Sequence, residues 1–399
     1  FIPEGALMRK ALSELQLSLE ANTEQIIAWR RHFRKHPELS GQEKATQGTL
    51  RTVLGEMGLT PRKAAGTGVV ADIVGGRSAG KIIALRADMD ALPIEDQGPE
   101  EYRSCAPGVC HACGHDGHMA SLLGAAAALV QQREQLPGTV RLLFQPCEES
   151  FPSGAQALID EGALEGVSAI VGLHLWQPLP AGMIAAVQGP IMASPDAFEI
   201  TVQGKGGHAS MPFQTVDALA AGAQIAVALR SSVSAVIDPL EPAVLALGML
   251  QAGDAFNVIP GQAVLKGTIR SFSQSVRETL FQRLEQVCRG ICEAEGAAYV
   301  LKRIYGHDPV VNEAQVTAVV AQEAAAVAGA ENVKRDFRPV MVGEDFSCYL
   351  AKVPGTFLLV GSGNEAQDIS FPHHHPRFDL DEAALPIGAA VLARSAWAL

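Results

Sequence analysis

Cysteine is scarce in this chain, and its number is odd. Seven cysteines occur among 399 residues. This count argues against a framework of disulfide bonds and favours a protein of a reducing compartment. Cys288 and Cys292 fall on a segment whose apolar residues recur at helical intervals, so we expect both to be small, buried hydrophobic side chains.

Long apolar runs and an excess of positive charge are also absent. No run approaches the roughly 20 apolar residues that a membrane-spanning helix needs, and residues 1–39 are amphipathic and charged without the apolar core of a secretory signal. The net charge of −12 argues against a nucleic acid or an anionic membrane as a partner. We expect a cytoplasmic protein that binds neither, although a local arginine or a metal ion could still hold an anionic substrate.

The length of the chain exceeds that of one typical core and therefore predicts two domains. Short apolar runs alternate with helical stretches up to about residue 190 and again after residue 305, which predicts an α/β domain with a mostly buried, mixed sheet. Between these parts the order is strand, helix, strand, strand, helix, strand, which is typical of a small two-layer α/β unit. We predict a discontinuous domain, residues 1–192 and 305–399, interrupted by an inserted domain, residues 193–304.

Residues 111–118 read HACGHDGH and lead into an alanine-rich helix. Thiolate, imidazole and carboxylate side chains bind borderline divalent metals, and all three occur here. In an extended stretch Cys113 and His115 point to the same side, so the segment predicts a metal site. A competing interpretation takes Cys110 and Cys113 as a redox pair or half of a structural zinc site, but the chain has no second C-x-x-C.

Three of the apolar runs end in acidic residues or histidine: they lead to Asp88 and Asp90, to Glu148 and Glu149, and to His174. Ligand sites in open α/β sheets form beyond the carboxyl ends of the strands, so these side chains are expected in one crevice. Adjacent glutamates would face opposite ways in a regular strand. Pro146 predicts an irregular turn, in which one glutamate can bind a metal while the other holds a proton.

Further candidates lie near the C-terminus and in the inserted region. Three consecutive histidines, His373 to His375, stand between prolines, and one of them is expected to be a metal ligand. His208 lies in GKGGHAS, whose glycines let a backbone approach a ligand closely. Asn257 and Arg270 could hold a carboxylate, the arginine through a bidentate grip.

Along the chain the motifs follow in this order: RRHFRKHPELSGQE, ALRADMDALPIED, HACGHDGHMASLLGAA, LLFQPCEES, GLHLWQ, GKGGHASMP, FNVIP with GTIR, VGEDFSCYL and HHHPRFDLDE. Taken together, they resemble the motifs of the amidohydrolase branch of the aminoacylase and carboxypeptidase superfamily, which includes hippurate hydrolase and the plant auxin-conjugate hydrolases. They span nearly the whole chain. The resemblance implies a zinc-exopeptidase-like catalytic domain with a two-metal centre, an inserted dimerisation or lid domain, and hydrolysis of the amide bond of N-acyl amino acids.

Carried onto this chain, the resemblance makes Cys113 a bridging ligand between two metal ions. It places His115 and His174 on one ion and Glu149 and His374 on the other. His374 is chosen among the three histidines because the family ligand stands two residues before the proline, here Pro376.

The remaining roles also follow from the resemblance. Glu148 matches the general base, and His208 matches a histidine that reaches the active site of the partner subunit. Asn257 and Arg270 match positions associated with the substrate carboxylate. Asp88 and Asp90 match a motif whose members, in this chain, are expected to orient the ligands instead of binding metal.

The resulting hypothesis is a metal-dependent amidohydrolase that cleaves N-acyl (acetyl, benzoyl or similar) L-amino acids. It predicts two divalent ions per subunit, zinc or manganese foremost and cobalt or nickel as alternatives, and a homodimer or a dimer-based homo-oligomer. A dipeptidase or carboxypeptidase with the same two-metal centre is the alternative enzyme. A non-catalytic metal-binding protein on the same fold is the alternative outside enzymes.

Overall fold

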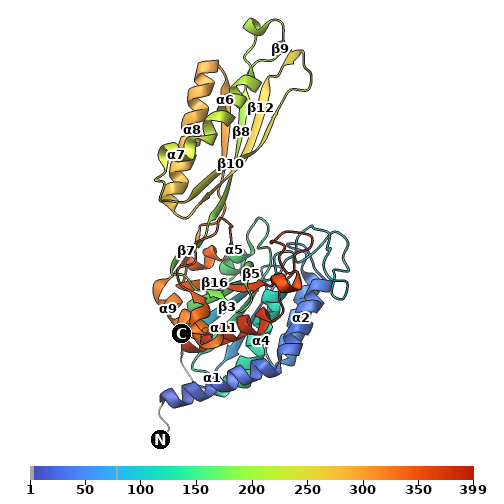
Figure 1. Ribbon diagram of the computed structural model, residues 1–399, viewed down its shortest axis with the longest axis vertical. Helices are drawn as coiled ribbons and strands as arrows, with labels where there is room; N and C mark the ends of the chain where they lie inside the picture. Colours follow the sequence, from blue (N-terminus) through green and yellow to red (C-terminus); the bar gives the residue numbers. More distant parts are fainter. Residues whose placement is uncertain (1–3, 78–79) are drawn as a thin grey trace. The chain divides into compact units, whose positions relative to one another are not determined.

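A computed structural model describes residues 4–77 and 80–399 (Figure 1). The chain divides into two compact units: unit 1 comprises the described parts of residues 1–189, 311–338 and 348–399, and unit 2 comprises residues 190–310 and 339–347. The sequence assigned residues 339–347 to the catalytic domain. They group with unit 2 because their backbone meets the start of its chain, where the amide of Ala193 donates to the carbonyl of Val342.

Unit 1 is built on an eight-stranded mixed sheet with the order β1-β2-β4-β3-β5-β16-β6-β15. The predicted α/β class with a mixed central sheet is thus confirmed. Its strands are β1 (Arg62–Ala64), β2 (Gly68–Val74), β3 (Ile82–Asp88), β4 (Thr139–Gln145), β5 (Val167–Pro180), β6 (Ile184–Ala185), β15 (Val333–Lys334) and β16 (Gly355–Gly363). The chain passes between the units four times, and two of these passages are at β7 (Gly189–Met192) and β14 (Val310–Asn312).

The central strands β4, β3, β5 and β16 run parallel to one another. Their side chains are almost all buried, as expected for strands covered on both faces. The helices of unit 1 are α1 (Glu4–Ala21), α2 (Thr23–Lys35), α3 (Lys44–Glu56), α4 (His115–Gln131), α5 (Gly154–Asp160), α9 (Ala314–Ala328), α10 (Ser347–Leu350) and α11 (Ala384–Ala398), with 3₁₀ turns at Arg133–Gln135, Ala330–Asn332 and Glu365–Gln367.

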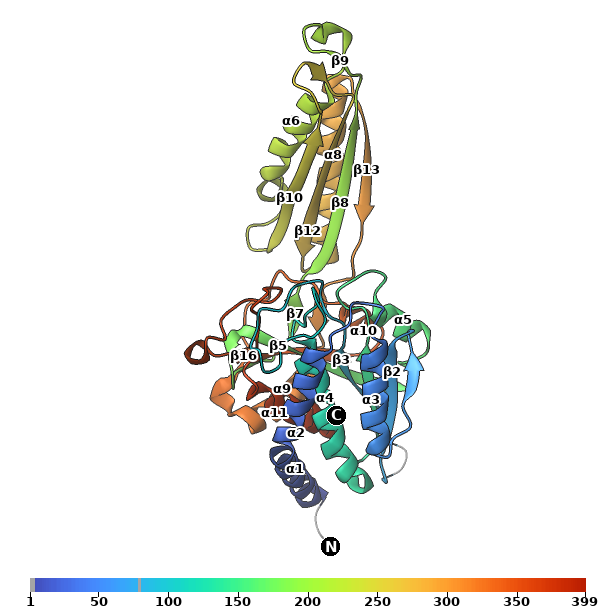
Figure 2. The same ribbon diagram turned by 90° about the vertical axis from the view of Figure 1, so that its right-hand side faces the viewer.

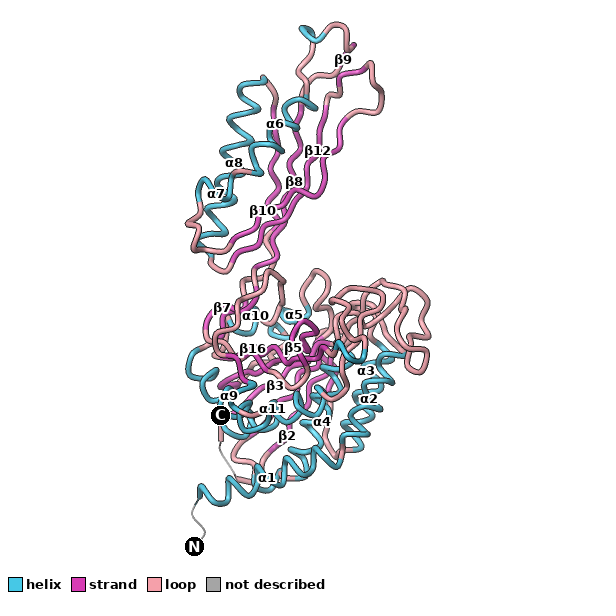
Figure 3. Tube along the Cα trace, in the orientation of Figure 1, coloured by secondary structure: helices cyan, strands magenta, loops and turns pink. Residues whose placement is uncertain are grey.

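Helices α4, α9 and α11 pack against the sheet, and α1 and α2 pack over α4 and α11 (Figure 1). The core between them is formed by alanine, leucine and valine side chains. Long loops follow β3 and β16 at one end of the sheet (Figure 3). This arrangement gathers the segments after the parallel strands and the start of α4 at one place.

Unit 2 is a two-layer unit in which helices pack on a four-stranded antiparallel sheet of order β10-β12-β8-β13 (Figure 2). Its elements follow the predicted order: β8 (Ser194–Gln203), β9 (Gly207–His208), a 3₁₀ turn at Pro212–Gln214, α6 (Ala218–Arg230), α7 (Ser232–Val236), β10 (Ala243–Ala252), β11 (Val258–Ile259), β12 (Gln262–Ser271), α8 (Gln274–Glu295) and β13 (Ala298–Ile304). Cys288 and Cys292 of α8 lie in its apolar core, as predicted.

Among the described residues, no helix combines the length and the apolar character that crossing a membrane would require.

Candidate metal centre

Ligand-type side chains from four segments of unit 1 meet near the carboxyl ends of β3 and β4, and His174 lies within β5, which continues to Pro180. Cys113 and His115 come from the start of α4, His174 from β5, Glu149 from the turn after β4, and His374 from the loop before α11. Cys113, His115 and His174 form one group whose ligand atoms lie within 4.8 Å of one another, and Cys113, Glu149 and His374 form a second. Cys113 therefore belongs to both groups, which is the arrangement expected of a ligand shared by two ions.

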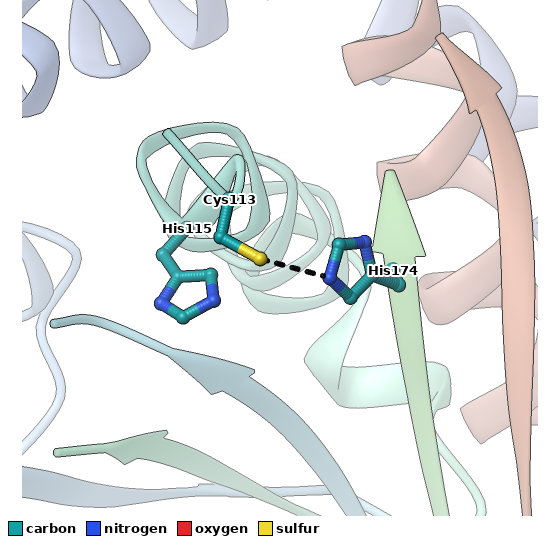
Figure 4. Close-up of side chains that lie close together, drawn as sticks. All are labelled: Cys113, His115 and His174. Carbon is teal, nitrogen blue, oxygen red and sulfur yellow. Dashed lines mark hydrogen bonds between the residues drawn. The ribbon is translucent and has the colours of Figure 1, made fainter. Parts of the chain in front are cut away.

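The sulfur of Cys113 lies 3.5 Å from Nε2 of His174, and the ring of His115 stands beside them (Figure 4). Gly114, between Cys113 and His115, has a φ of +94°, a conformation that glycine adopts without strain. On the other side, Nε2 of His374 lies 3.2 Å from Oε1 of Glu149. The two groups are thus built around one thiol.

The histidine rings are oriented by backbone carbonyls. Nδ1 of His115 lies 2.8 Å from the carbonyl oxygen of Asp90, and Nδ1 of His174 lies 3.0 Å from that of Leu175. Each contact places the proton on Nδ1 and leaves the lone pair of Nε2 directed at the centre, as metal-binding histidines require.

The donor set fits divalent metal ions. Nε2 of His115 and Oε1 of Glu149 are buried and have no hydrogen-bond partner among the described residues. Buried polar atoms are normally satisfied, so two unsatisfied ligand atoms at one centre indicate that a ligand belongs there. Thiolate, imidazole and carboxylate together match a borderline metal and not magnesium or calcium.

The side chains around the centre carry negative charge. Burial, together with the charges of Glu149 and Glu148, raises the pKa of the Cys113 thiol well above its ordinary value. Burial opposes protonation of His115, but Asp88, Asp90 and Glu149 together raise its pKa to about 10. Cations at this position would relieve the repulsion among the acids and favour the thiolate.

Glu148 and Glu149 both face the centre because the chain turns irregularly after β4. Cys147 has a φ of +51°, and the carboxylate of Asp90 accepts the amide N–H groups of Glu148 and Glu149 at 3.1 and 3.0 Å. Oε2 of Glu148 and Oε1 of Glu149 lie 4.0 and 3.9 Å from Nε2 of His115. Asp90 therefore positions both glutamates, and the hydroxyl of Ser40 donates to Oδ2 of the same carboxylate.

Asp88 does not face the centre as a free ligand. It accepts hydrogen bonds from Nη1 of Arg86 and from Nδ1 of His118, both at 2.6 Å. Burial works to raise its pKa, but the charges of His115, Arg86 and His118 hold it well below the usual range. Nε2 of His118 in turn accepts the N–H of Leu175, so both of its ring nitrogens are engaged within the protein.

The other members of the HACGHDGH segment also lie outside the two ligand groups. Asp116 accepts a hydrogen bond from Arg30. His111 is buried, neither of its ring nitrogens has a hydrogen-bond partner in the described part of the chain, and burial lowers its pKa to about 4. The dense cluster thus supplies two ligand candidates, Cys113 and His115.

The three consecutive histidines have three different surroundings. His374 reaches Cys113 and Glu149, whereas His373 stacks on Trp176 with ring centroids 4.7 Å apart, and His375 stacks on Phe371. His374 has a φ of +66°, an uncommon conformation for a residue with a side chain. Its amide donates to the carbonyl of Ala112 at 2.8 Å, which holds it there.

Comparison with known proteins identifies the family of the chain. Residues 84–398 match the model of peptidase family M20/M25/M40. The chain belongs to this family.

The relatives of this M20 family chain include proteins named as amidohydrolases and proteins named as carboxypeptidases. The chain is 47% identical over 288 residues to an N-acyl-L-amino acid amidohydrolase of Geobacillus stearothermophilus, and the match covers 72% of this chain and 78% of the relative. It is 38% identical to thermostable carboxypeptidase 2 of Saccharolobus solfataricus over 91% of this chain and 92% of the relative. Among solved structures, the Bacillus subtilis YXEP protein, described as a dinuclear metal-binding peptidase of the M20 family, superposes with a TM-score of 0.82 at 38% identity, over 94% and 98% of the two chains.

The predicted site residues of the inserted region lie in unit 2. His208 in β9 pairs with Val258 in β11, and the carbonyl of Asn257 accepts the N–H of Ala209, so His208 and Asn257 lie together beyond one end of the sheet (Figure 2). Arg270 lies near the other end of β12, where its Nη1 donates to the carbonyl of Asp196. Unit 2 therefore brings His208 and Asn257 together and keeps Arg270 apart from them.

Two buried arginines of α2 were not singled out from the sequence. Arg30 and Arg34 are fully buried and bind the segments that carry the metal-ligand candidates. Their spacing in the sequence indicates that they lie on the buried face of the helix. They are four residues apart, on the same face, and that face also carries the buried apolar residues Ile26 and Phe33.

Proposed function

We propose that this protein is a metal-dependent amidohydrolase that cleaves N-acyl L-amino acids into a carboxylic acid and a free amino acid. The observation that carries the proposal is the pair of ligand groups sharing Cys113, with Glu148 beside them. In this arrangement Glu149 completes one ligand group, and Glu148, the preceding residue in the chain, would carry out proton transfer.

Cys113 would bridge two divalent ions, with His115 and His174 holding one and Glu149 and His374 the other. Such ions act as Lewis acids and lower the pKa of water. Zinc and manganese are the proposed metals, with cobalt and nickel as alternatives, because the donor set contains a thiolate.

Glu148 would act as general base and then as general acid. Its carboxylate takes a proton from the attacking water and delivers that proton to the departing amine, which must leave protonated. The hydrogen bond from its backbone N–H to Asp90 fixes the turn that carries it. Asp88 and Asp90 serve this chemistry by orienting His118, Glu148 and Glu149.

Unit 2 would supply groups that bind the substrate. Gln262 of β12 pairs with Gln203, at the end where His208 and Asn257 lie, and Arg270 stands eight residues further along the strand. At about 3.4 Å per residue this separation is about 27 Å, too long for one small substrate. We therefore infer a homodimer in which His208 and Asn257 act at the centre of the partner subunit. Asn257 and Arg270 can then bind one substrate carboxylate together only if each of them comes from a different chain.

The relatives support a small substrate with an amide bond. The amidohydrolase name favours an N-acyl amino acid, and the carboxypeptidase name supports the alternative of a peptide substrate. The odd number of cysteines, seven, supports the proposal that the protein works in the cytoplasm.

A panel of substrates with added Zn²⁺, Mn²⁺ or Co²⁺ tests the proposal. We expect N-acetyl and N-benzoyl L-amino acids to be cleaved with higher kcat/KM than dipeptides or C-terminal residues of longer peptides. Higher kcat/KM on peptides would favour the carboxypeptidase alternative. Absence of cleavage across the whole panel with two ions bound would contradict both and leave a metal-binding protein.

A further inference from the structure

Arg30 and Arg34 of α2 contact the same two segments of unit 1. One segment, residues 111–116, carries Cys113 and His115, and the other, residues 374–382, begins with His374. Both guanidinium groups have no solvent exposure. Two buried charges on successive turns of one helix thus lie between the segments that supply three of the five proposed ligands.

Arg34 binds a backbone carbonyl of each segment. Its Nη1 donates to the carbonyl of His111 at 2.7 Å, and its Nη2 donates to the carbonyl of Phe378 at 2.8 Å. Nε and Nη2 also form a fork to the carboxylate of Asp96, at 2.9 and 3.0 Å. A planar guanidinium fixes these directions relative to one another, which the ammonium group of lysine cannot do.

Arg30 repeats the pattern through side chains. Its Nε donates to Asp116 at 2.8 Å, its Nη2 to Asp379, and its Nη1 to Glu382 at 3.3 Å. Asp116 directly follows His115 in the chain. Arg34 therefore links the two segments through their backbone carbonyls, and Arg30 links them through their side-chain carboxylates.

The separation of the two segments bears directly on the second ligand group. Among the described residues, a backbone hydrogen bond joins the two segments directly, from the amide of His374 to the carbonyl of Ala112, and His374 is held in a left-handed conformation. The carbonyl of His111, one residue earlier, is bound by Arg34. A shift of either segment would move His374 relative to Cys113.

We propose that Arg34, assisted by Arg30, is a positioning residue that sets the distance between Cys113 and His374 and thereby the affinity of the metal ion held by Cys113, Glu149 and His374. This inference rests on the proposed metal centre. Stability alone is a weak reason for such a group, because replacing a buried ion pair with apolar side chains is often neutral for folding.

The test compares Arg34→Lys with Arg141→Lys in the full-length protein. Arg141 is a matched control: it forks to the carboxylate of Asp72 and donates to the carbonyls of Ala163 and Glu165, but it contacts neither ligand segment. Each protein is dialysed against buffered Co²⁺. Bound ions are counted by elemental analysis, and the near-ultraviolet absorption of thiolate-bound Co²⁺ reports on Cys113.

We expect Arg34→Lys to bind one of the two ions about 10- to 100-fold more weakly, the range found when residues that orient metal ligands are replaced. Arg141→Lys should bind both ions as the wild type does, even if its thermal midpoint falls. Unchanged binding in Arg34→Lys, or equal weakening in both variants, would overturn the positioning role. A wild type that binds fewer than two ions would instead contradict the proposed centre itself.

If Arg34→Lys does not fold, Arg30→Lys tests the positioning role in its place. We expect it to weaken the same ion by a smaller factor, because an ammonium group can still meet some of the carboxylates around Arg30. Wild-type affinity for both ions in Arg30→Lys would then overturn the proposal.

Discussion

Glu148 and Glu149 are neighbours in the chain but have different surroundings. Oε1 of Glu149 belongs to one ligand group with Cys113 and His374 and lies 3.2 Å from Nε2 of His374, whereas Oε2 of Glu148 lies 4.0 Å from Nε2 of His115. A carboxylate enclosed by ligand atoms suits metal binding, and one at the margin suits proton transfer. The two residues should therefore respond differently to the same isosteric substitution.

We expect Glu148→Gln to lower kcat by about 10²- to 10⁴-fold, because the amide cannot accept the proton of the attacking water. Both metal ions should remain bound. Kinetics and elemental analysis of the same preparation measure the two effects.

Glu149→Gln is the control for this prediction. It changes the same atoms one residue away, and it should release an ion as well as abolish turnover. A Glu148→Gln variant with wild-type kcat, or one that loses metal as Glu149→Gln does, would contradict the assignment of base and ligand.

At the scale of elements, α2 is fixed to the loop after β3 by the ion pair between Arg34 and Asp96. The carboxylate of Asp96 also accepts the N–H groups of Gly98 and Ser104. Burial works to raise the pKa of Asp96, but the charge of Arg34 and these hydrogen bonds lower it below the usual value. A lowered pKa in the folded state means that the ionised carboxylate stabilises the fold.

The sign of the pH dependence follows from this shift. The stabilisation by Asp96 is fully present above its pKa in the unfolded chain, about 3.9, and is lost as the pH falls through the lower pKa of the folded state. We expect Asp96→Asn to lower the free energy of unfolding by about 3–5 kcal/mol at pH 7, because it leaves Arg34 buried without its counter-charge. The difference from the wild type should shrink below about pH 4, as measured by urea unfolding at several pH values.

Asp72→Asn provides the comparison for Asp96→Asn. The Asp72 side chain is 36% exposed, so its pair with Arg141 should contribute about 1 kcal/mol or less. An Asp96→Asn effect as small as that of Asp72→Asn, or one that grows as the pH falls, would contradict the role given to Asp96.

Local spacing in the sequence predicted the elements and the ligand types, but it predicted the contacts between segments less well. The order of strands and helices in unit 2 followed from periodicity, and Cys113 and His115 from the density of ligand residues. The choice of His374 depended on the family resemblance, since its left-handed backbone and its bond to Ala112 are set by a segment more than 250 residues away in the chain. Asp90 bonding to the amides after β4 is likewise a tertiary contact.

Buried charge was the least predictable feature of the sequence. Arginines in a helix such as α2 are usually solvated, so Arg30 and Arg34 gave no sign of their partners in segments far along the chain. The grouping of residues 339–347 with unit 2 has the same cause, because it depends on pairing with residues about 150 positions earlier.

On the scale of the whole molecule, all five proposed ligands lie in unit 1 and none in unit 2. Binding to the folded state alone stabilises it by about 2.7 kcal/mol for each ion at a free concentration 100 times its Kd. We expect a chelator to lower the thermal stability of unit 1 and to leave the amide hydrogen exchange of β8 and β12 unchanged. Calorimetry and hydrogen exchange measure the two responses.

Cys113→Ser is the control for metal removal, because a weaker ligand at the shared position should make stability insensitive to the chelator. Equal loss of protection in both units would mean that the ions do not act through unit 1 alone. No change in the wild type would contradict metal binding in the folded state.

The placement of His208 predicts how two inactive variants combine. A subunit with Glu148→Gln has a defective centre but an intact His208, and a subunit with His208→Ala has the reverse. If His208 serves the partner's centre, each mixed dimer contains one complete centre, so random mixing in equal amounts should restore about a quarter of the wild-type activity. Mixing Glu148→Gln with Glu149→Gln should restore none, because both changes lie in unit 1 and leave every centre defective.

Differently tagged subunits allow the mixed dimers to be separated and assayed. Mixed dimers of Glu148→Gln and His208→Ala that form but stay inactive, or a protein that remains monomeric, would remove the basis for placing His208 at the centre of the partner subunit.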